Sequence, residues 1–137
     1  MIKVNRVESV CIPVADQDAA LDFYTNVLGF TLRTDTPFEP GLRWIEVGPE
    51  GESSTTIALA PASESAKVGG QLTGIIVLVD DIDGFHSQLK AAGTDVDDEV
   101  QRMGDPVPPL FWFRDPEGNT IQAAQEEGVH GVRRRRR

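Results

Sequence analysis

Residues 42–51 read LRWIEVGPEG, and residues 110–118 read LFWFRDPEG. Each stretch is a short apolar run with tryptophan at its third position and a Pro-Glu-Gly turn at its end. This pattern is typical of a β-strand that leads into a tight turn. Two more matched pairs follow the same order, Thr56-Ile57-Ala58 with Thr120-Ile121-Gln122 and Asp16 with Asp81. The four pairs lie 64 to 68 residues apart, so the chain contains an internal duplication.

Both copies predict the same order of elements, a strand, a helix and three more strands. In the first copy we expect strands at residues 7–14, 31–36, 42–47 and 55–60. A helix starts from the capping residue Asp16 and ends at Gly29, because apolar residues recur between them at spacings of three and four. The second copy predicts a strand at 74–79, a helix from Asp81 to Gly93, a polar edge strand at 95–102, and strands at 110–114 and 119–124.

The length of 137 residues fits one domain, and hydrophobic residues make up 39% of the chain, enough for a globular core. We expect a single domain at residues 1–127. It contains module one at 6–61, a linker at 62–71 rich in alanine, serine and glycine, and module two at 72–125. The arginine-rich stretch 128–137 is expected to be a disordered tail.

Charge and cysteine content restrict the partners and the compartment. The net charge is −9, and residues 1–132 alone carry −14, which would repel nucleic acid. No apolar run approaches the roughly 20 residues that a membrane span needs, and the N-terminus lacks a secretory signal. The single cysteine, Cys11, favours a reducing compartment, so we expect a cytoplasmic protein. Its apolar surroundings in sequence predict a buried structural thiol.

The chain resembles the vicinal oxygen chelate superfamily, which includes glyoxalase I, bleomycin-resistance proteins and extradiol dioxygenases. The resemblance covers about residues 6–125 and is carried by Val14-Ala15-Asp16, Ala20-Leu21-Asp22-Phe23-Tyr24, Val27-Leu28-Gly29-Phe30 and Phe113-Arg114-Asp115-Pro116-Glu117-Gly118-Asn119. It implies an α+β fold of two tandem β-α-β-β-β modules whose curved mixed sheets form a cleft. Many members are homodimers, so we expect a homodimer here. Whether the modules pair within one chain or by exchange between two chains stays open.

Metal-dependent members place four ligands on the strands, and the resemblance carries these positions onto Ser9, Ala58, Gly74 and Gln122. Ala58 and Gly74 have no side-chain donor, and Ser9 is a poor ligand for a transition metal. Gln122 alone cannot hold an ion. The two histidines, His86 in the second helix and His130 in the tail, are expected to lie away from the cleft, with His86 either solvated or on a helix face. We therefore expect no metal and no other cofactor.

If the metal positions face the cleft, strand alternation assigns their neighbours to the same surface. The expected ligand-binding residues are Ser9, Cys11, Phe38, Trp44, Ala58, Gly74, Met103, Trp112 and Gln122. The aromatic residues among them would also fit a hydrophobic core. Glu46 is a candidate for a general base or a charge partner, since it shares a strand face with Trp44. Together with the acidic surface it favours a cationic or aromatic ligand.

Three functions fit this set of residues. The leading hypothesis is a metal-free small-molecule-binding protein of the glyoxalase/bleomycin-resistance type, which sequesters a drug-like or metabolite ligand and so confers antibiotic resistance. The alternative is an enzyme of the superfamily, a glyoxalase-like lyase or isomerase or a dioxygenase, with a non-standard or metal-independent site. A third is a scaffold whose cleft has lost its ligand. The sequence names neither the ligand nor any reaction.

Overall fold

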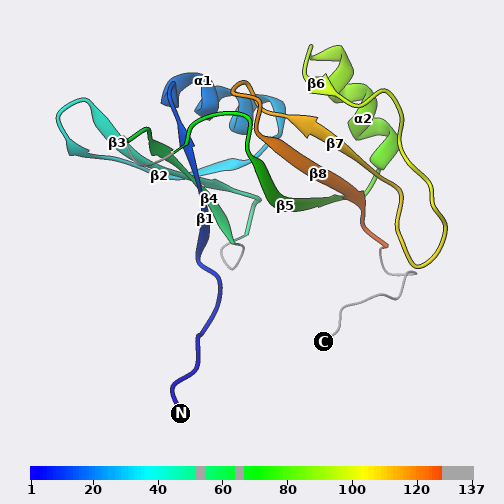
Figure 1. The fold of residues 1–137 in the computed structure, drawn as a ribbon, viewed down its shortest axis with the longest axis horizontal. Coiled ribbons are helices and arrows are strands. Elements are labelled where there is room, and N and C mark those ends of the chain that lie inside the picture. Colours follow the sequence, from blue (N-terminus) through cyan, green and yellow to red (C-terminus); the bar gives the residue numbers. More distant parts are fainter. Residues whose placement is uncertain (52–54, 64–66, 128–137) are drawn as a thin grey trace. The chain divides into compact units, whose positions relative to one another are not determined.

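The computed structural model describes residues 1–51, 55–63 and 67–127. The predicted tail at 128–137, His130 included, lies outside them. The chain divides into two compact units, residues 1–69 and 70–137, and each is treated by itself (Figure 1). No helix in the described ranges has the length and apolar character needed to cross a membrane.

Unit 1 has the predicted strand–helix–three-strand order. Its elements are β1 (Ser9–Val14), α1 (Gln17–Asp22) with its π-helical continuation η1 (Phe23–Val27), β2 (Thr31–Glu39), β3 (Leu42–Gly48) and β4 (Thr56–Pro61). The sheet order is β1-β4-β3-β2, with β1 parallel to β4 and the other pairs antiparallel. Asp16 caps α1 by accepting a hydrogen bond from the Ala19 N–H at 3.0 Å, as its position before the apolar stripe predicts.

The core of unit 1 lies between the helical segment and one face of the sheet. Phe23 and Tyr24 meet edge to face with ring centroids 5.3 Å apart. The fully or almost fully buried side chains are Ile12, Val14, Ala20, Tyr24, Ile45, Val47 and Leu59. Burying each of the larger ones contributes about 1.5–3 kcal/mol, so this face fixes the fold. The opposite face, called the open face below, has no described helix packed on it.

Unit 2 repeats the plan. Its elements are β5 (Leu72–Val79), α2 (Ile82–Ala91), β6 (Asp95–Val96), β7 (Leu110–Arg114) and β8 (Thr120–Gln125), in the sheet order β5-β8-β7-β6. Asp81 caps α2 by accepting from the Gly84 N–H at 2.9 Å. Phe85 of α2 contacts Phe111 and Phe113 at 6.0 Å each, so these two aromatic residues belong to the core. The two four-stranded mixed sheets confirm the predicted fold class.

Two local predictions in unit 2 are wrong. The edge strand expected at 95–102 is only Asp95–Val96, followed by one isolated bridge between Gln101 and Leu110. His86 is buried rather than solvated, with Nε2 2.7 Å from the carbonyl oxygen of Asp97 and its ring against Phe111 at 4.8 Å. The histidine thus holds the chain after β6 against the helix through the carbonyl oxygen of Asp97, whose N–H still donates to the Trp112 carbonyl oxygen at 3.0 Å.

The turn between β7 and β8 is fixed by side chains. The Asp115 carboxylate accepts from the backbone N–H groups of Glu117 and Asn119, both at 2.9 Å, and from the Asn119 amide at 3.0 Å. The Asn119 amide oxygen accepts from the Gln71 N–H at 3.1 Å. Since Asn119 is fully buried, this turn links β8 to the start of β5 through bonds that water cannot replace.

In unit 1 a single arginine joins three elements. Arg43 of β3 binds both carboxylate oxygens of Asp35 on β2, at 3.0 and 2.9 Å, and Asp18 of α1 at 2.6 Å. The hydrogen bonds from Arg43 hold the pKa of Asp35 below its usual value. The same bonds, led by that with Asp35, raise the pKa of Arg43, which therefore stays charged.

We expect Asn119→Ala to destabilise the protein by about 1–3 kcal/mol, because the Gln71 N–H and one Asp115 oxygen lose their buried partner. Urea denaturation followed by circular dichroism measures this loss. Asp98→Ala, at an exposed position, is the control and should leave the midpoint unchanged. Equal midpoints for Asn119→Ala and the unmodified protein would contradict the role given to the turn.

The Asp35–Arg43 pair predicts a pH-dependent contribution to stability. The folded pKa of Asp35 lies below the unfolded value of about 3.9, so its contribution is complete above that value and is lost as the pH falls through the folded pKa. The difference in free energy of unfolding between the unmodified protein and Asp35→Asn should therefore be larger at pH 7 than at pH 3. A difference that does not change between these pH values, measured by urea titration, would refute the assignment.

Candidate functional site

The open face of unit 1 gathers most of the side chains predicted for the first module. In the β1–β4 register Ser9 faces Thr56 and Cys11 faces Ala58, and on the other side of β4 Ala58 faces Glu46 of β3. Trp44, two residues before Glu46, shares its face. The strand pairing therefore brings Ser9, Cys11, Trp44, Glu46 and Ala58 to one surface.

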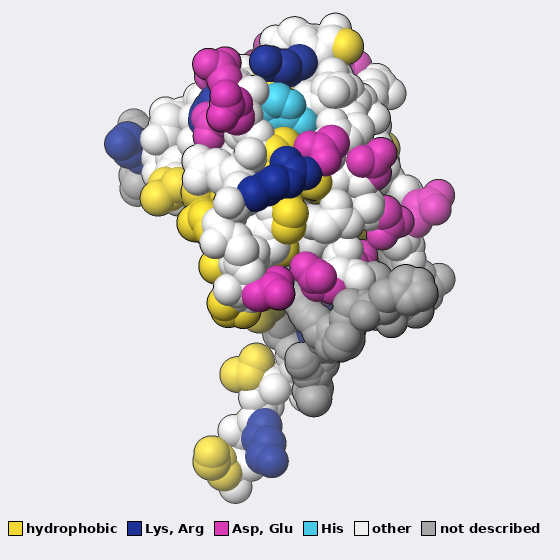
Figure 2. All heavy atoms as spheres, turned by 90° about the vertical axis from the view of Figure 1, so that its right-hand side faces the viewer, with side chains coloured by type: hydrophobic (Ala, Val, Ile, Leu, Met, Phe, Trp, Pro, Cys, Tyr) yellow, Lys and Arg dark blue, Asp and Glu magenta, His cyan; other side chains and the backbone are white. Residues whose placement is uncertain are grey.

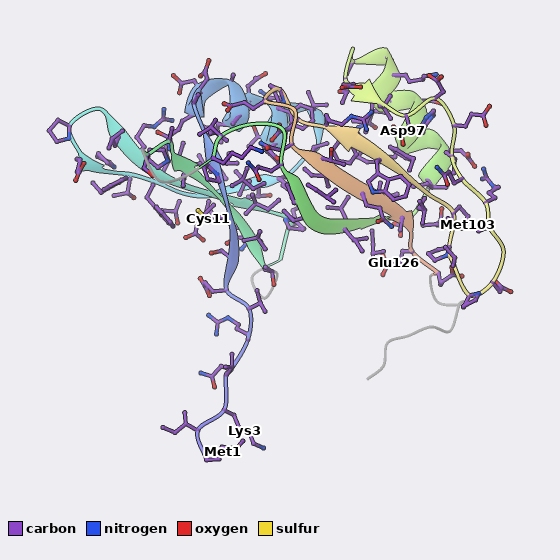
Figure 3. All side chains as sticks on the ribbon, in the orientation of Figure 1. Met1, Lys3, Cys11, Asp97, Met103 and Glu126 are labelled. Carbon is purple, nitrogen blue, oxygen red and sulfur yellow. The ribbon has the colours of Figure 1, made fainter. Side chains whose placement is uncertain are left out.

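Cys11 is exposed, which corrects the prediction of a buried thiol (Figure 3). Two features explain the error. β1 is an edge strand of its sheet, and Cys11 alternates with Ile12, whose side chain points into the core. Its neighbour across the register is Ala58, which is fully buried, so the exposure of Cys11 belongs to the edge strand and not to its neighbour.

Phe38 lies at the far end of β2, two residues after Thr36, which faces Trp44. It is about half exposed, and a register shift between Pro37 and Glu39 falls at this point. Met103, also exposed, lies outside both sheets, in the loop between Gln101 and Leu110 that their isolated bridge closes (Figure 3). Its place on a ligand-binding surface therefore stays a prediction.

Glu46 is held at both carboxylate oxygens. The indole Nε1–H of Trp44 donates to Oε2 at 2.7 Å, and the hydroxyl of Thr56 donates to Oε1 at 2.8 Å. Thr56 is buried, whereas Trp44 keeps 37% of its surface exposed. The carboxylate is thus fixed beside an accessible indole ring.

The corresponding face of unit 2 carries three more of the predicted residues, Gly74, Trp112 and Gln122. Trp112 of β7 faces Gln122 of β8, which in turn faces Ile76 of β5. Gly74 lies in the register shift between Leu72 and Ile76 and has φ +75°, a backbone conformation that strains any other residue. β5 also exposes three large apolar side chains on this face, Leu72, Ile76 and Leu78.

Sequence reasoning missed Arg114 on this face. It follows Trp112 by two residues and forms ion pairs with Asp95 and Asp97, both at 3.0 Å. Desolvation lowers the pKa of Arg114, but the hydrogen bonds with the two carboxylates outweigh it and the net shift is upward. Its position two residues after a tryptophan, like that of Glu46, is a signal that could have identified it. In the view of Figure 2, acidic side chains lie around a few basic ones.

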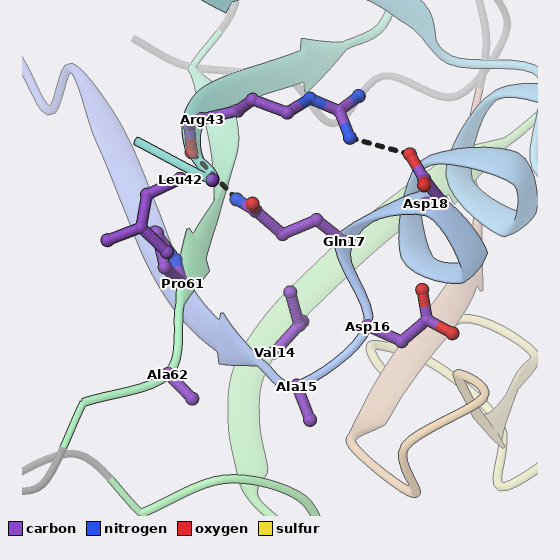
Figure 4. A pocket seen from close by; sticks show the side chains of 10 residues that line it. Val14, Ala15, Asp16, Gln17, Asp18, Leu42, Arg43, Pro61 and Ala62 are labelled. Carbon is purple, nitrogen blue, oxygen red and sulfur yellow. Dashed lines mark hydrogen bonds and ion pairs between the residues drawn. The ribbon is translucent and has the colours of Figure 1, made fainter. Parts of the chain in front are cut away.

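Unit 1 has a hollow of about 480 Å³ at the ends of β1 and β4 (Figure 4). Gln17 crosses it and donates through Nε2 to the carbonyl oxygens of Arg43 and Leu59, at 2.7 and 2.9 Å. Arg43, with its ion pair to Asp18, forms another wall. Leu42 and Arg43 of β3 both line this hollow, whereas Trp44, Glu46 and Ala58 do not. The hollow was not predicted from the sequence.

The side chains at the four implied metal positions do not fit an ion. In unit 1 the hydroxyl of Ser9 and the methyl of Ala58 leave Glu46 as the adjacent carboxylate, and one carboxylate does not supply the three protein ligands that a bound metal usually has. In unit 2, Gly74 offers no side chain and Gln122 only an amide. Within residues 1–51, 55–63 and 67–127, no group of three His, Cys, Asp or Glu side chains is placed to share a metal.

Known proteins agree with this architecture. TnmS3, an antibiotic binding protein from Streptomyces sp. CB03234, has a crystal structure with a TM-score of 0.79 and 31% identity, over 91% of this chain and 98% of its own. A superfamily member from Sphaerobacter thermophilus gives 0.79 and 34%, over 90% and 98%. A probable lactoylglutathione lyase of Vibrio cholerae is 25% identical, over 92% of this chain and 94% of its own.

The family model for the glyoxalase/bleomycin resistance protein/dioxygenase superfamily matches residues 4–123. That range covers both strand–helix–three-strand units and the duplicated motifs. The chain therefore belongs to this superfamily.

Proposed function

We propose that this protein binds and sequesters a drug-like or metabolite ligand without a metal ion. The observation that carries the proposal is the open face of unit 1, where an accessible indole lies beside a fixed carboxylate, and the implied metal position on β4 holds Ala58, which has no donor. The similarity to TnmS3, an antibiotic binding protein, supports the same class of ligand and a role in resistance.

The binding free energy indicates how many contacts such a ligand must make. A micromolar dissociation constant requires about 8 kcal/mol. Covering about 100 Å² of the Trp44 ring supplies about 2.5 kcal/mol at 25 cal/mol per Å². The ligand must therefore use several contacts, and the remaining predicted residues of unit 1, Ser9, Cys11 and Phe38, are the proposed sources. The residues predicted in unit 2, Gly74, Met103, Trp112 and Gln122, are proposed as ligand contacts of that unit. An aromatic ligand with a positive charge suits both the tryptophans and the acidic surface.

We also propose that the protein is a cytoplasmic homodimer. The single thiol, Cys11, is exposed and suits a reducing compartment. β5 leaves Leu72, Ile76 and Leu78 exposed at 80, 57 and 51%, and the extended N-terminal segment leaves Ile2 and Val4 almost fully exposed. A second copy that covers these apolar side chains would remove them from water.

The alternative function is an enzyme, for which Glu46 is the candidate general base. The similarity of the chain to a probable lactoylglutathione lyase and the fixed position of the Glu46 carboxylate favour an enzyme. In such an enzyme Glu46 would accept a proton from a substrate carbon or hydroxyl bound beside Trp44. Turnover of a hemithioacetal that Glu46→Gln abolishes would favour the enzyme over the binding protein.

Ligand binding should quench tryptophan fluorescence. The chain has two tryptophans, and titration with a panel of cationic aromatic natural products should reveal saturable quenching at micromolar concentrations for at least one compound. Trp44→Phe should weaken binding of that compound, and EDTA should not. Absence of quenching by the whole panel would contradict sequestration, and loss of binding in EDTA would contradict the metal-free site.

The dimer predicts a mass of about twice the 14.9 kDa of one chain in multi-angle light scattering. Ile76→Asp should shift the protein toward the monomer, because it places a charge in the apolar contact. Gln101→Asp, at an exposed site outside the apolar strand, is the control. A monomeric mass for the unmodified protein at tens of micromolar would refute the dimer.

A further inference from the structure

Trp44, Glu46 and Thr56 form a cluster in which the carboxylate has a fixed orientation. Trp44 and Glu46 lie two residues apart on β3, and Thr56 lies on β4 two residues before Ala58, the residue that faces Glu46. One neutral N–H and one neutral O–H each engage a different oxygen, at 2.7 and 2.8 Å. A carboxylate has about four acceptor positions, so each oxygen can accept one more hydrogen bond.

The charge of Glu46 has no cationic partner. Both donors are uncharged, and no lysine or arginine in the described part of the chain forms an ion pair with this carboxylate. Side chains that cover Glu46 partly remove it from water, and the exposed surface beside it is the indole of Trp44, since Ala58 is fully buried. A partly desolvated, unbalanced negative charge favours binding of a cation at this point.

The duplicated sequence supplies an internal comparison. Trp44 matches Trp112, and at the same spacing of 68 residues Glu46 matches Arg114. In unit 2 the charge at this position is already paired, since Asp95 and Asp97 both bind Arg114 at 3.0 Å. The matched tryptophans are thus retained, whereas only unit 1 leaves the adjacent charge unbalanced. The charge of Glu46 is not needed to build this kind of unit.

We infer that Glu46 recognises a protonated amine on the ligand, while the aromatic part of the same ligand covers the Trp44 ring. The ammonium group donates to the Glu46 oxygens beside the exposed indole of Trp44. Trp44 and Thr56 act as positioning residues, because their hydrogen bonds aim the carboxylate at that point. The inference rests on the proposed binding function and adds the ligand class, aromatic compounds that carry a primary or secondary amine. A neutral hydroxyl group could also donate to Glu46, but it would leave the charge unbalanced.

A matched pair of probes tests the amine directly. 1-Naphthylmethylamine and 1-naphthalenemethanol share one ring system and differ in an ammonium group against a hydroxyl group. Dissociation constants for both would be measured by NMR titration of ¹⁵N-labelled protein at about 0.15 M salt, where long-range attraction by the acidic surface is screened. The amine should bind at least about tenfold more tightly, which corresponds to about 1.4 kcal/mol.

Three variants locate the source of this preference. Glu46→Gln should reduce the amine-to-alcohol affinity ratio toward one, and Thr56→Val should reduce it partly without changing the affinity for the alcohol. Glu50→Gln removes the same charge from an exposed turn of the same unit and should keep the full ratio. Thermal unfolding checks that each variant is folded. The ratio, unlike the affinity itself, does not respond to a general loss of structure.

The outcomes separate this inference from the proposed function. Equal affinities for the amine and the alcohol in the unmodified protein, or a full ratio retained in Glu46→Gln, would overturn the inference and leave sequestration standing. Binding of neither probe, together with no quenching by the natural products, would overturn both. A ratio lost equally in Glu46→Gln and Glu50→Gln would assign the preference to the surface charge and overturn the role of Glu46.

Discussion

The site depends on the alternation of side chains along four paired strands that carry a helix on one face only. In unit 1 this alternation sends Ile45, Val47 and Leu59 into the core beneath α1 and η1. It leaves their neighbours Trp44, Glu46 and Ala58 on the open face. A shift of one residue in the β3–β4 register would exchange the two sets, so packing of the core fixes the chemistry of the open face.

The duplication shows how one plan yields two different surfaces. Both units keep the capping aspartate, the tryptophan of the third strand and the threonine of the last strand. The residue two positions after the tryptophan differs, a carboxylate held by neutral donors in unit 1 and a guanidinium held by two carboxylates in unit 2. Side chains on an open face can diverge in this way because they contribute little to the core, which has to retain its shape.

Much of the fold could be predicted from the sequence, because repeat and periodicity report on local structure. The strand at residues 110–114 has the predicted bounds, and both helix caps form as expected. The strand expected at 95–102 ends at Val96. The Asp97 side chain forms an ion pair with Arg114, and the Asp97 carbonyl oxygen lies within hydrogen-bond distance of His86 Nε2. That outcome depends on tertiary partners that alternation alone does not reveal.

The candidate site was predictable only in part. Strand alternation assigned Ser9, Cys11 and Ala58 to one surface, and the register pairs Cys11 with Ala58 and Ala58 with Glu46, while their part in ligand binding stays a prediction. It did not reveal that Cys11 is exposed, because the position of β1 at a sheet edge follows from the pairing of distant segments. For the same reason the hydrogen bonds from Trp44 and Thr56 to Glu46 and the ion pairs of Arg114 became apparent only in the folded chain.

The two indole N–H signals in a ¹H–¹⁵N spectrum test the central claim most directly, since one of them belongs to the Trp44 group that donates to Glu46. Its assignment follows from the signal that disappears in Trp44→Phe. If the ligand binds on the open face, it shifts the Trp44 indole signal in step with saturation. Binding on the open face is contradicted if a ligand saturates the protein while this signal stays in place and only backbone amides around Gln17 and Arg43 move.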